Sequence, residues 1–286
     1  MKYVNVNEIA AKWNLSERSV RNYCAHGKIP GVILDGKTWR IPEDAVKPVR
    51  KKRAEKIAND LLTRLKMEKE AGIPGGIYHK VQIELTYNSN HMEGSRLTHD
   101  QTRYIFETNT IGIQDEVVNV DDIVETVNHF RCIDQIIELA NYNLSEAFIK
   151  QLHYILKSGT SDSRKTWFAV GEYKRFENEV GGSATAKPAD VSGEMRNLLS
   201  RYNLSKQKTL KEIIQFHYEF EKIHPFQEGN GRTQRIYIEQ LCLNNGRFEI
   251  DFTDVSKEEM IAASVRSANA SNDMLEKLIS NCLVEK

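Results

Sequence analysis

Twelve consecutive residues, His224 to Arg235, combine side chains that are suited to phosphate chemistry. They read His-Pro-Phe-Gln-Glu-Gly-Asn-Gly-Arg-Thr-Gln-Arg. His224 can accept a proton near neutral pH, because the unperturbed pKa of histidine lies there. Glu228 offers the hard oxygen ligands that Mg²⁺ prefers. These residue types indicate a phosphate site with a base and a metal ligand beside it.

Helical patterns flank this stretch on both sides. Apolar residues at helical spacing over 210–223 predict a helix that must end before the proline of the stretch. Gly229-Asn230-Gly231 then leads into a second helical pattern that runs to residue 244. At a helix N-terminus, backbone N–H groups and the helix dipole favour an anion. Arg232 and Arg235 are three residues apart, so both could hold the outer phosphates of a nucleotide.

The same twelve residues match every fixed position of the Fic motif, HPFx(D/E)GNGRxxR, so the chain resembles the Fic family. The resemblance implies transfer of AMP from ATP to a Ser, Thr or Tyr hydroxyl of a target protein. It makes His224 the catalytic base, Glu228 the Mg²⁺ ligand and Phe226 a packing anchor. It assigns phosphate binding to Gly229, Asn230, Gly231, Arg232 and Arg235. The residue types alone indicate the kind of site but not which nucleotide it binds.

A second short stretch, Ser89-Asn-His-Met-Glu93-Gly94, resembles the Fic inhibitory motif, (S/T)xxxE(G/N). Ser89 and Glu93 are four residues apart in a predicted helix over about 76–91, so both can face one partner. The resemblance implies that Glu93 pairs with Arg235 and competes with productive binding of ATP. A surface glutamate that only caps or bridges the helix is the alternative.

The N-terminal residues 1–48 predict a small winged helix-turn-helix domain. Residues 4–13 suggest a short helix with Ile9 and Trp13 inward, and Ser16 is placed to cap a second helix over 17–26. Asp35-Gly36 lies between alternating residues and predicts a hairpin, the wing.

This domain resembles the MerR and excisionase type of winged helix-turn-helix, which implies DNA binding. Residues 1–56 contain 13 Lys and Arg against 6 Asp and Glu, a net charge of +7, so the remaining residues carry −7. A basic unit joined to an acidic one indicates that only the first meets a polyanion. A protein-binding or packing domain is the alternative. The candidate DNA contacts are Arg18, Ser19, Arg21, Asn22, Lys37 and Arg40.

A mainly α fold is predicted for the rest of the chain. Residues 49–56 form a basic linker, and a Fic domain is expected over 57–286. Helical patterns cover 54–71, 76–91, 98–107, 120–140, 146–157, 191–203 and 256–283, besides the two helices around the motif. A single β-hairpin is expected over Val170–Val180 and the glycines after it. By resemblance it is the flap that holds the target, with Tyr173 to Val180 beside the site, although a purely structural hairpin is the alternative.

Composition narrows the remaining possibilities. The 286 residues are 40% hydrophobic and 28% charged, as in an ordinary globular protein. No apolar run reaches the roughly 18–20 residues of a membrane span, and no signal peptide opens the chain, so a cytoplasmic location without membrane contact is expected. The widely spaced Cys24, Cys132, Cys242 and Cys282 predict neither disulfides nor a zinc site.

His217 lies on the apolar face of the helix before the motif and is interpreted as a satisfied core histidine. Resemblance also implies a homodimer. Three functions remain open: an autoinhibited adenylyltransferase that carries a DNA-binding domain, a hydrolase that removes AMP with the help of Glu93, and a transcription regulator that senses nucleotide. A pure sensor needs no base, so the intact His224 argues against the third.

Overall fold

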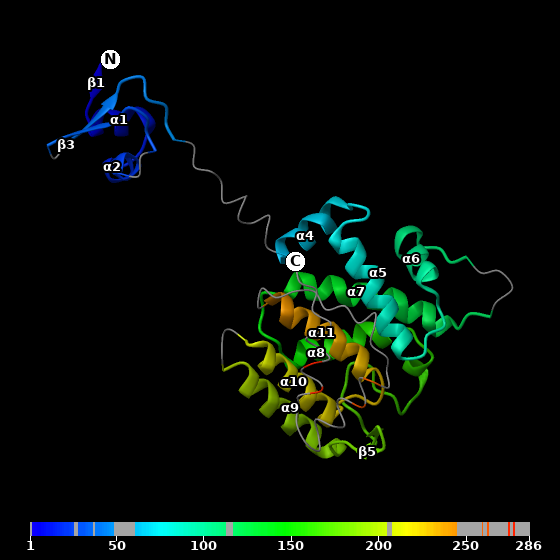
Figure 1. Cartoon of the computed structure of the whole chain (residues 1–286). Coiled ribbons are helices and arrows are strands. Elements are labelled where there is room, and N and C mark those ends of the chain that lie inside the picture. Colours follow the sequence, from blue (N-terminus) through cyan, green and yellow to red (C-terminus); the bar gives the residue numbers. More distant parts are fainter. Residues whose placement is uncertain are drawn as a thin grey trace. The chain divides into compact units, whose positions relative to one another are not determined.

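The chain forms two compact units, Met1–Lys56 and Ile57–Lys286 (Figure 1). The computed structural model describes residues 2–25, 28–36, 38–48, 61–112, 117–204 and 208–244, with four single positions after them. The predicted linker 49–56 lies outside these residues, and so does the helix expected over 256–283 apart from the single positions. The described part of each unit has its own hydrophobic core.

The first unit is a helix-turn-helix with a wing, as predicted. Its elements are β1 (Tyr3–Val4), α1 (Val6–Trp13), α2 (Glu17–Ala25), β2 (Ile33–Asp35) and β3 (Thr38–Pro42). Asn14 takes a left-handed conformation between the helices, with a φ of 53°, and the Ser16 hydroxyl accepts from the Ser19 N–H at 3.3 Å. The strands pair antiparallel in the order β1-β3-β2. Strand β1 was not predicted, because two residues are too few to show alternation.

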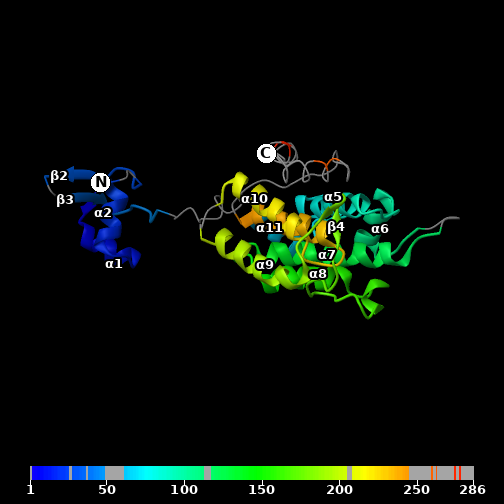
Figure 2. The same ribbon diagram turned by 90° about the horizontal axis from the view of Figure 1, so that it is seen from below.

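The second unit is a helix bundle built around its last described helix. The helices are α4 (Leu61–Ala71), α5 (Ile77–Met92), α6 (His99–Thr108), α7 (Val120–Leu139), α8 (Glu146–Lys157), α9 (Pro188–Tyr202), α10 (Leu210–Ile223) and α11 (Asn230–Asn244). Helix α11 packs against α5, α7, α8 and α10, and both ribbon views show it between them (Figures 1 and 2). The mainly α prediction is confirmed. Within the described residues, no helix combines the length and apolarity needed to cross a membrane.

Helix caps explain why the observed boundaries lie close to the predicted ones. Thr98 with Gln101, and Thr209 with Glu212, form capping boxes at the starts of α6 and α10. The side chains of Asn119 and Ser145 accept hydrogen bonds from the first turns of α7 and α8. Each helix start is therefore fixed by residues next to it in the sequence.

The predicted hairpin is present but much shorter than expected. Its strands are β4 (Glu179–Val180) and β5 (Ser183–Ala184), and residues 170–178 form no strand. The Lys174 N–H donates instead to the Pro225 carbonyl at 2.8 Å, and the Phe176 N–H donates to Gln227 Oε1 at 3.2 Å. The hydrogen bonds of this segment therefore go to the loop after α10 rather than to a second strand.

Candidate active site

His224 ends α10 in a conformation that few non-glycine residues adopt. Its φ is +49°, in the left-handed region, and its N–H donates to the Phe220 carbonyl at 2.8 Å. This conformation costs roughly 1–2 kcal/mol for an L-residue and is typical of functional sites. It also turns the chain sharply at the imidazole, so the loop that follows runs toward the start of α11.

Asn230 and Phe226 fix the shape of that loop. Asn230 Oδ1 accepts from the Phe226 N–H, and Asn230 Nδ2 donates to the Phe226 carbonyl, both at 2.8 Å. The Phe226 ring is fully buried and stacks on His153 with 4.0 Å between centroids. The predicted packing anchor is therefore present. Gly229, with a φ of +80°, supplies the turn into α11.

His153 of α8 also contacts this loop, between α10 and α11. The Gly171 N–H donates to His153 Nδ1 at 2.9 Å, so the ring hydrogen sits on Nε2 and is donated to the Glu228 carbonyl at 3.0 Å. Burial lowers the pKa of His153 to about 4, so the ring is neutral at pH 7.

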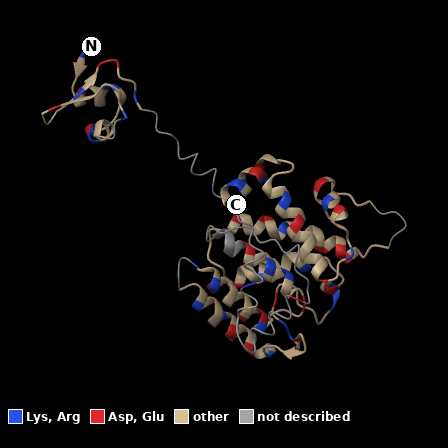
Figure 3. Cartoon of the chain, in the orientation of Figure 1, with Lys and Arg blue, Asp and Glu red and all other residues tan. Residues whose placement is uncertain are grey.

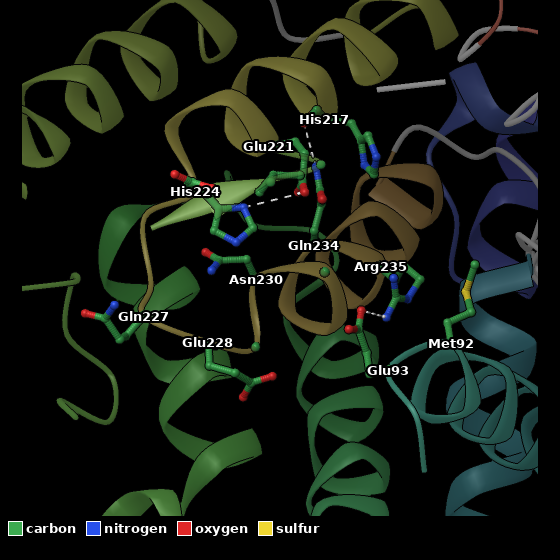
Figure 4. Close-up of a pocket in the computed structure, with 15 residues that line it drawn as sticks. Met92, Glu93, His217, Glu221, His224, Gln227, Glu228, Asn230, Gln234 and Arg235 are labelled. Atoms are coloured by element: carbon green, nitrogen blue, oxygen red, sulfur yellow. Dashed lines mark hydrogen bonds and ion pairs between the residues drawn. The ribbon is translucent and has the colours of Figure 1, made fainter. Parts of the chain in front are cut away.

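The loop borders an open cavity of about 310 Å³ (Figure 4). The cavity brings together the predicted His224, Glu228, Arg235, Glu93 and the glycine turn 229–231. The tip of the flap also reaches it. The other residues that line it are Met92, Glu179, Val180, Gly181, His217, Glu221, Gln227 and Gln234.

Arg235 is held by the predicted inhibitory residues. Its guanidinium lies 2.7 Å from Glu93 Oε1, and its Nε donates to the Ser89 hydroxyl at 3.0 Å (Figure 4). A third bond runs from Nη2 to the Ser89 carbonyl at 3.0 Å. The Arg235 side chain is only 5% exposed. The predicted ion pair is therefore present and occupies a guanidinium expected to bind phosphate.

Arg232 does not line the cavity, and its phosphate contact stays a prediction. Its terminal nitrogens pair with Glu125 of α7 and with Glu228, the latter at 2.7 Å. Lys157 of α8 completes the cluster, with ion pairs to Glu125, Glu228 and Asp162. We call these five residues, Glu125, Lys157, Asp162, Glu228 and Arg232, the buried charge cluster. Glu125 and Glu228 would compete with a phosphate for Arg232.

Glu228 remains a carboxylate in this setting. Burial by itself would raise its pKa, but Arg232 and Lys157 hold the pKa below its usual value. The side chain is 42% exposed and faces the cavity beside the glycine turn. Among the described residues no group of three or more His, Cys, Asp or Glu is arranged to hold a metal ion. A single carboxylate nevertheless fits Mg²⁺ that is shared with substrate phosphates.

Several residues of the site were missed or interpreted differently from the sequence. His217 is buried, but its Nδ1 has no hydrogen-bond partner among the described residues and its side chain borders the cavity, so it is not a satisfied core histidine. Lys157 and Glu125 had no local motif that could mark them. Glu221 was also missed, although His217, Glu221 and His224 share one helix face by their spacing of four and three.

In the N-terminal unit, most predicted DNA contacts lie on the surface. Arg18, Arg21 and Asn22 are exposed on α2, and Arg40 is exposed on β3. Arg21 pairs with Glu17 at 2.7 Å and Arg40 with Asp35 at 3.5 Å. Exposed pairs of this kind contribute only about 0–1 kcal/mol to stability, so a phosphate can replace the carboxylate at little cost in free energy. Lys37 lies outside the described residues.

Comparison with known proteins agrees with this geometry. Residues 143–242 match the Fic/DOC family model, and residues 3–48 match a helix-turn-helix domain model. Protein adenylyltransferase Fic of Aedes aegypti is 30% identical over 191 residues, which are 63% of this chain and 34% of that protein. Protein adenylyltransferase VbhT of Bartonella schoenbuchensis is 42% identical over 67 residues, 23% of this chain and 14% of that protein.

The fold also has a solved counterpart. The crystal structure of a Fic domain containing signaling protein from Bacteroides thetaiotaomicron has a TM-score of 0.63 at 23% identity and covers 77% of this chain and 91% of that one. The present chain spans about a third of the length of the curated proteins named Fic that it matches.

Proposed function

Because this chain carries a Fic/DOC domain behind a helix-turn-helix domain, we propose that it is an autoinhibited protein adenylyltransferase. The proposed reaction transfers AMP from ATP to a Ser, Thr or Tyr hydroxyl of a target protein. The observation that carries this proposal is the cavity in which His224, the glycine turn and the Glu93–Arg235 pair meet. The matched adenylyltransferases support the choice of AMP.

In the proposed reaction, the hydroxyl oxygen of the target attacks the α-phosphorus of ATP. His224 takes the hydroxyl proton, the bond to the β-phosphate breaks, and pyrophosphate leaves. The N–H groups at the start of α11 bind the phosphates, and Arg235 steadies the outer ones once Glu93 has left it. A general base contributes about 10²- to 10⁴-fold, so positioning and charge stabilisation must supply the rest.

Glu228 would hold Mg²⁺ together with phosphate oxygens, and the ion would supply neutralisation of the phosphate charge. The rest of the buried charge cluster keeps the Glu228 carboxylate ionised and in place. Lys157 and Arg232 would therefore assist metal binding by holding the Glu228 carboxylate beside the glycine turn.

Autoinhibition follows from the pairing of Arg235. Helix α5 carries Ser89 and ends at Glu93, its C-cap residue. It is fixed to α7 by the Asn90–Thr126 hydrogen bond at 3.2 Å and the Thr86–His129 hydrogen bond at 2.9 Å. Glu93 therefore stands on a packed helix rather than on a loose segment. Its negative charge at the phosphate end of the cavity repels the γ-phosphate of ATP while it occupies Arg235.

Replacement of Glu93 tests the proposal directly. With labelled ATP and Mg²⁺, Glu93→Gly should incorporate label into protein at least about tenfold faster than the parent, because Arg235 becomes available to phosphate. Adding His224→Ala to this variant should lower the rate of incorporation by at least about 10²-fold. Incorporation would be followed by autoradiography, and mass spectrometry would identify the nucleotide and the acceptor residue.

Glu84→Gln is the matched control, because Glu84 lies on the same helix and pairs with His99 instead of Arg235. It should label like the parent. Equal labelling of Glu93→Gly with and without His224 would contradict the role of the base. Release of AMP from a modified protein by the parent, lost in Glu93→Gly, would favour the hydrolase instead.

A further inference from the structure

The carboxylate of Glu221 faces the imidazole of His224 inside the cavity. Glu221 Oε1 lies 3.5 Å from His224 Nδ1, and both side chains are 16% exposed (Figure 4). Both residues border the cavity. The distance exceeds that of a normal hydrogen bond, as is common for catalytic hydrogen bonds before substrate binds.

The backbone explains why these two side chains meet. Glu221 occupies the last turn of α10, three residues before His224, and residues at this spacing lie on the same helix face. His224 leaves the helix in the left-handed conformation while its N–H still bonds to the Phe220 carbonyl. The imidazole is thereby kept against the last turn instead of following the loop outward.

Glu221 carries a negative charge that its surroundings scarcely neutralise. Its Oε2 is buried and has no hydrogen-bond partner among the described residues. Burial would raise the pKa of Glu221, yet the interaction with His224 holds it below its usual value. A buried carboxylate is costly unless a donor meets it. The imidazole of His224, with Nδ1 at 3.5 Å from Oε1, is placed to be that donor.

The other charged groups near the dyad make different contacts. Glu93 is bound to Arg235, and Glu228 is bound to Lys157 and Arg232. Burial lowers the pKa of His217 to about 4, so His217 adds no charge at pH 7. In the described part of the chain, none of these groups pairs with His224 Nδ1.

We propose that Glu221 is the positioning residue of His224, since its carboxylate accepts the Nδ1–H hydrogen bond and leaves Nε2 unprotonated. Nε2, on the far side of the ring from Glu221, then takes the proton of the attacking hydroxyl. The carboxylate also stabilises the imidazolium that results, as in other carboxylate–histidine pairs. This inference rests on the proposed function, in which His224 is the base.

The test compares Glu221→Gln with the parent in two measurements. Nitrogen-15 NMR of ring-labelled histidine reports the tautomer of His224 without any need for activity, and His224→Ala identifies the signal. We expect the Nδ1–H tautomer in the parent and a mixture of both tautomers in Glu221→Gln, because an amide can donate to Nδ1 as well as accept from it.

Kinetics supply the second measurement, in the Glu93→Gly background. Glu221→Gln should lower kcat by about 10²- to 10⁴-fold and change KM for ATP by less than about threefold. Glu219→Gln is the control on the same helix, because Glu219 bonds to Arg201 and Gln215 on the other side. It should change neither the tautomer nor kcat. Urea unfolding would establish that both variants are folded.

Two results would overturn the inference: the same single tautomer in Glu221→Gln and the parent, or a kcat that stays within about threefold of the Glu93→Gly value. Failure of the proposed function has a different signature, since Glu93→Gly would then incorporate no nucleotide at all. In that event the tautomer measurement still decides the role of Glu221.

Discussion

Among the described residues of the site, Lys157 is the cation with the most ion pairs. Its side chain is 3% exposed, and its ammonium lies 2.5 Å from Glu125, 2.9 Å from Asp162 and 2.5 Å from Glu228. Burial favours loss of its proton, but Glu228 and Glu125 hold the pKa of Lys157 above its usual value. Together with Arg232 it forms ion pairs with three carboxylates that lie close together. One of the three, Glu228, is the expected metal ligand.

Removing this ammonium should therefore destabilise the domain. Lys157→Met keeps the length of the side chain but removes the buried cation that these three carboxylates share, and breaking a buried ion pair in this way costs about 3–5 kcal/mol. Urea unfolding followed by circular dichroism would measure the loss. Lys165→Met is the control, since Lys165 also pairs with Asp162 but is 44% exposed, and its loss should cost no more than about 1 kcal/mol. If the two variants lost the same free energy of unfolding, the buried ion pairs of Lys157 would contribute no more to stability than the exposed pair of Lys165.

At the level of secondary-structure elements, the contact between α5 and α11 depends on a glycine. A Cβ on Gly231 would lie 2.5 Å from Glu93 Oε1 and 3.1 Å from Arg235 Nη1. The glycine leaves room there for the Glu93 carboxylate to reach the first turn of α11, whereas a Cβ would displace that carboxylate. The same residue therefore belongs to the predicted phosphate contact and lies against the Glu93–Arg235 pair, which is the proposed inhibitory contact.

The β4–β5 hairpin is tied to the end of α10 and to the loop after it by another buried cation, Lys174. Its ammonium donates to Asn178 Oδ1 at 2.7 Å, to the Thr185 hydroxyl at 2.6 Å and to the Ile223 carbonyl at 3.1 Å. Asn178 in turn donates to the Phe226 carbonyl at 2.9 Å. Burial lowers the pKa of Lys174 to about 8, so most of it is still protonated at pH 7.

Loss of this tie should loosen the hairpin while the helices stay folded. In Lys174→Met, we expect amide hydrogen exchange over residues 179–185 to accelerate by about tenfold or more, which corresponds to about 1.4 kcal/mol of local stability. Lys187→Met, an exposed lysine at the start of α9, is the control and should leave exchange in the hairpin unchanged. Unchanged exchange in Lys174→Met would mean that β4 and β5 hold their place without it.

For the whole molecule, the two units differ in charge and in the partner that each suits. Figure 3 colours the lysines and arginines of the described residues blue. In the N-terminal unit, Arg18, Arg21 and Arg40 are exposed. With a net charge of +7 over residues 1–56 and a helix-turn-helix match over 3–48, this unit is suited to a polyanion. We propose that it binds DNA.

Arg21→Ala tests that proposal. Binding to a mixed-sequence DNA duplex, followed by fluorescence anisotropy at low salt, should weaken, and the slope of log affinity against log salt should fall by about 1. Lys2→Ala removes one positive charge next to β1 rather than from α2 and should have a smaller effect, because Lys2 pairs with Glu43. If the parent protein fails to bind the duplex at low salt, the DNA-binding proposal is wrong.

The elements and the kind of chemistry were predictable because their determinants are local. Caps such as Thr98 and Thr209 lie within three residues of the backbone groups that they satisfy, and the twelve residues of the motif are contiguous. Apolar spacing within each helix likewise depends only on neighbours in the chain. Even the Glu93–Arg235 pair could be predicted, but only through resemblance to a family, since 142 residues separate the two side chains.

Folding decided which charges meet. Glu125, Lys157 and Asp162 come from three different elements, and no spacing in the chain marks them as neighbours of Glu228. Arg232 pairs with Glu125 and Glu228 and does not line the cavity. Residues 174–178 make hydrogen bonds to the end of α10 and to the loop after it, and they do not extend the hairpin. Buried charges and backbone groups must find partners wherever the packed helices leave them, and that choice depends on the positions of all the elements together.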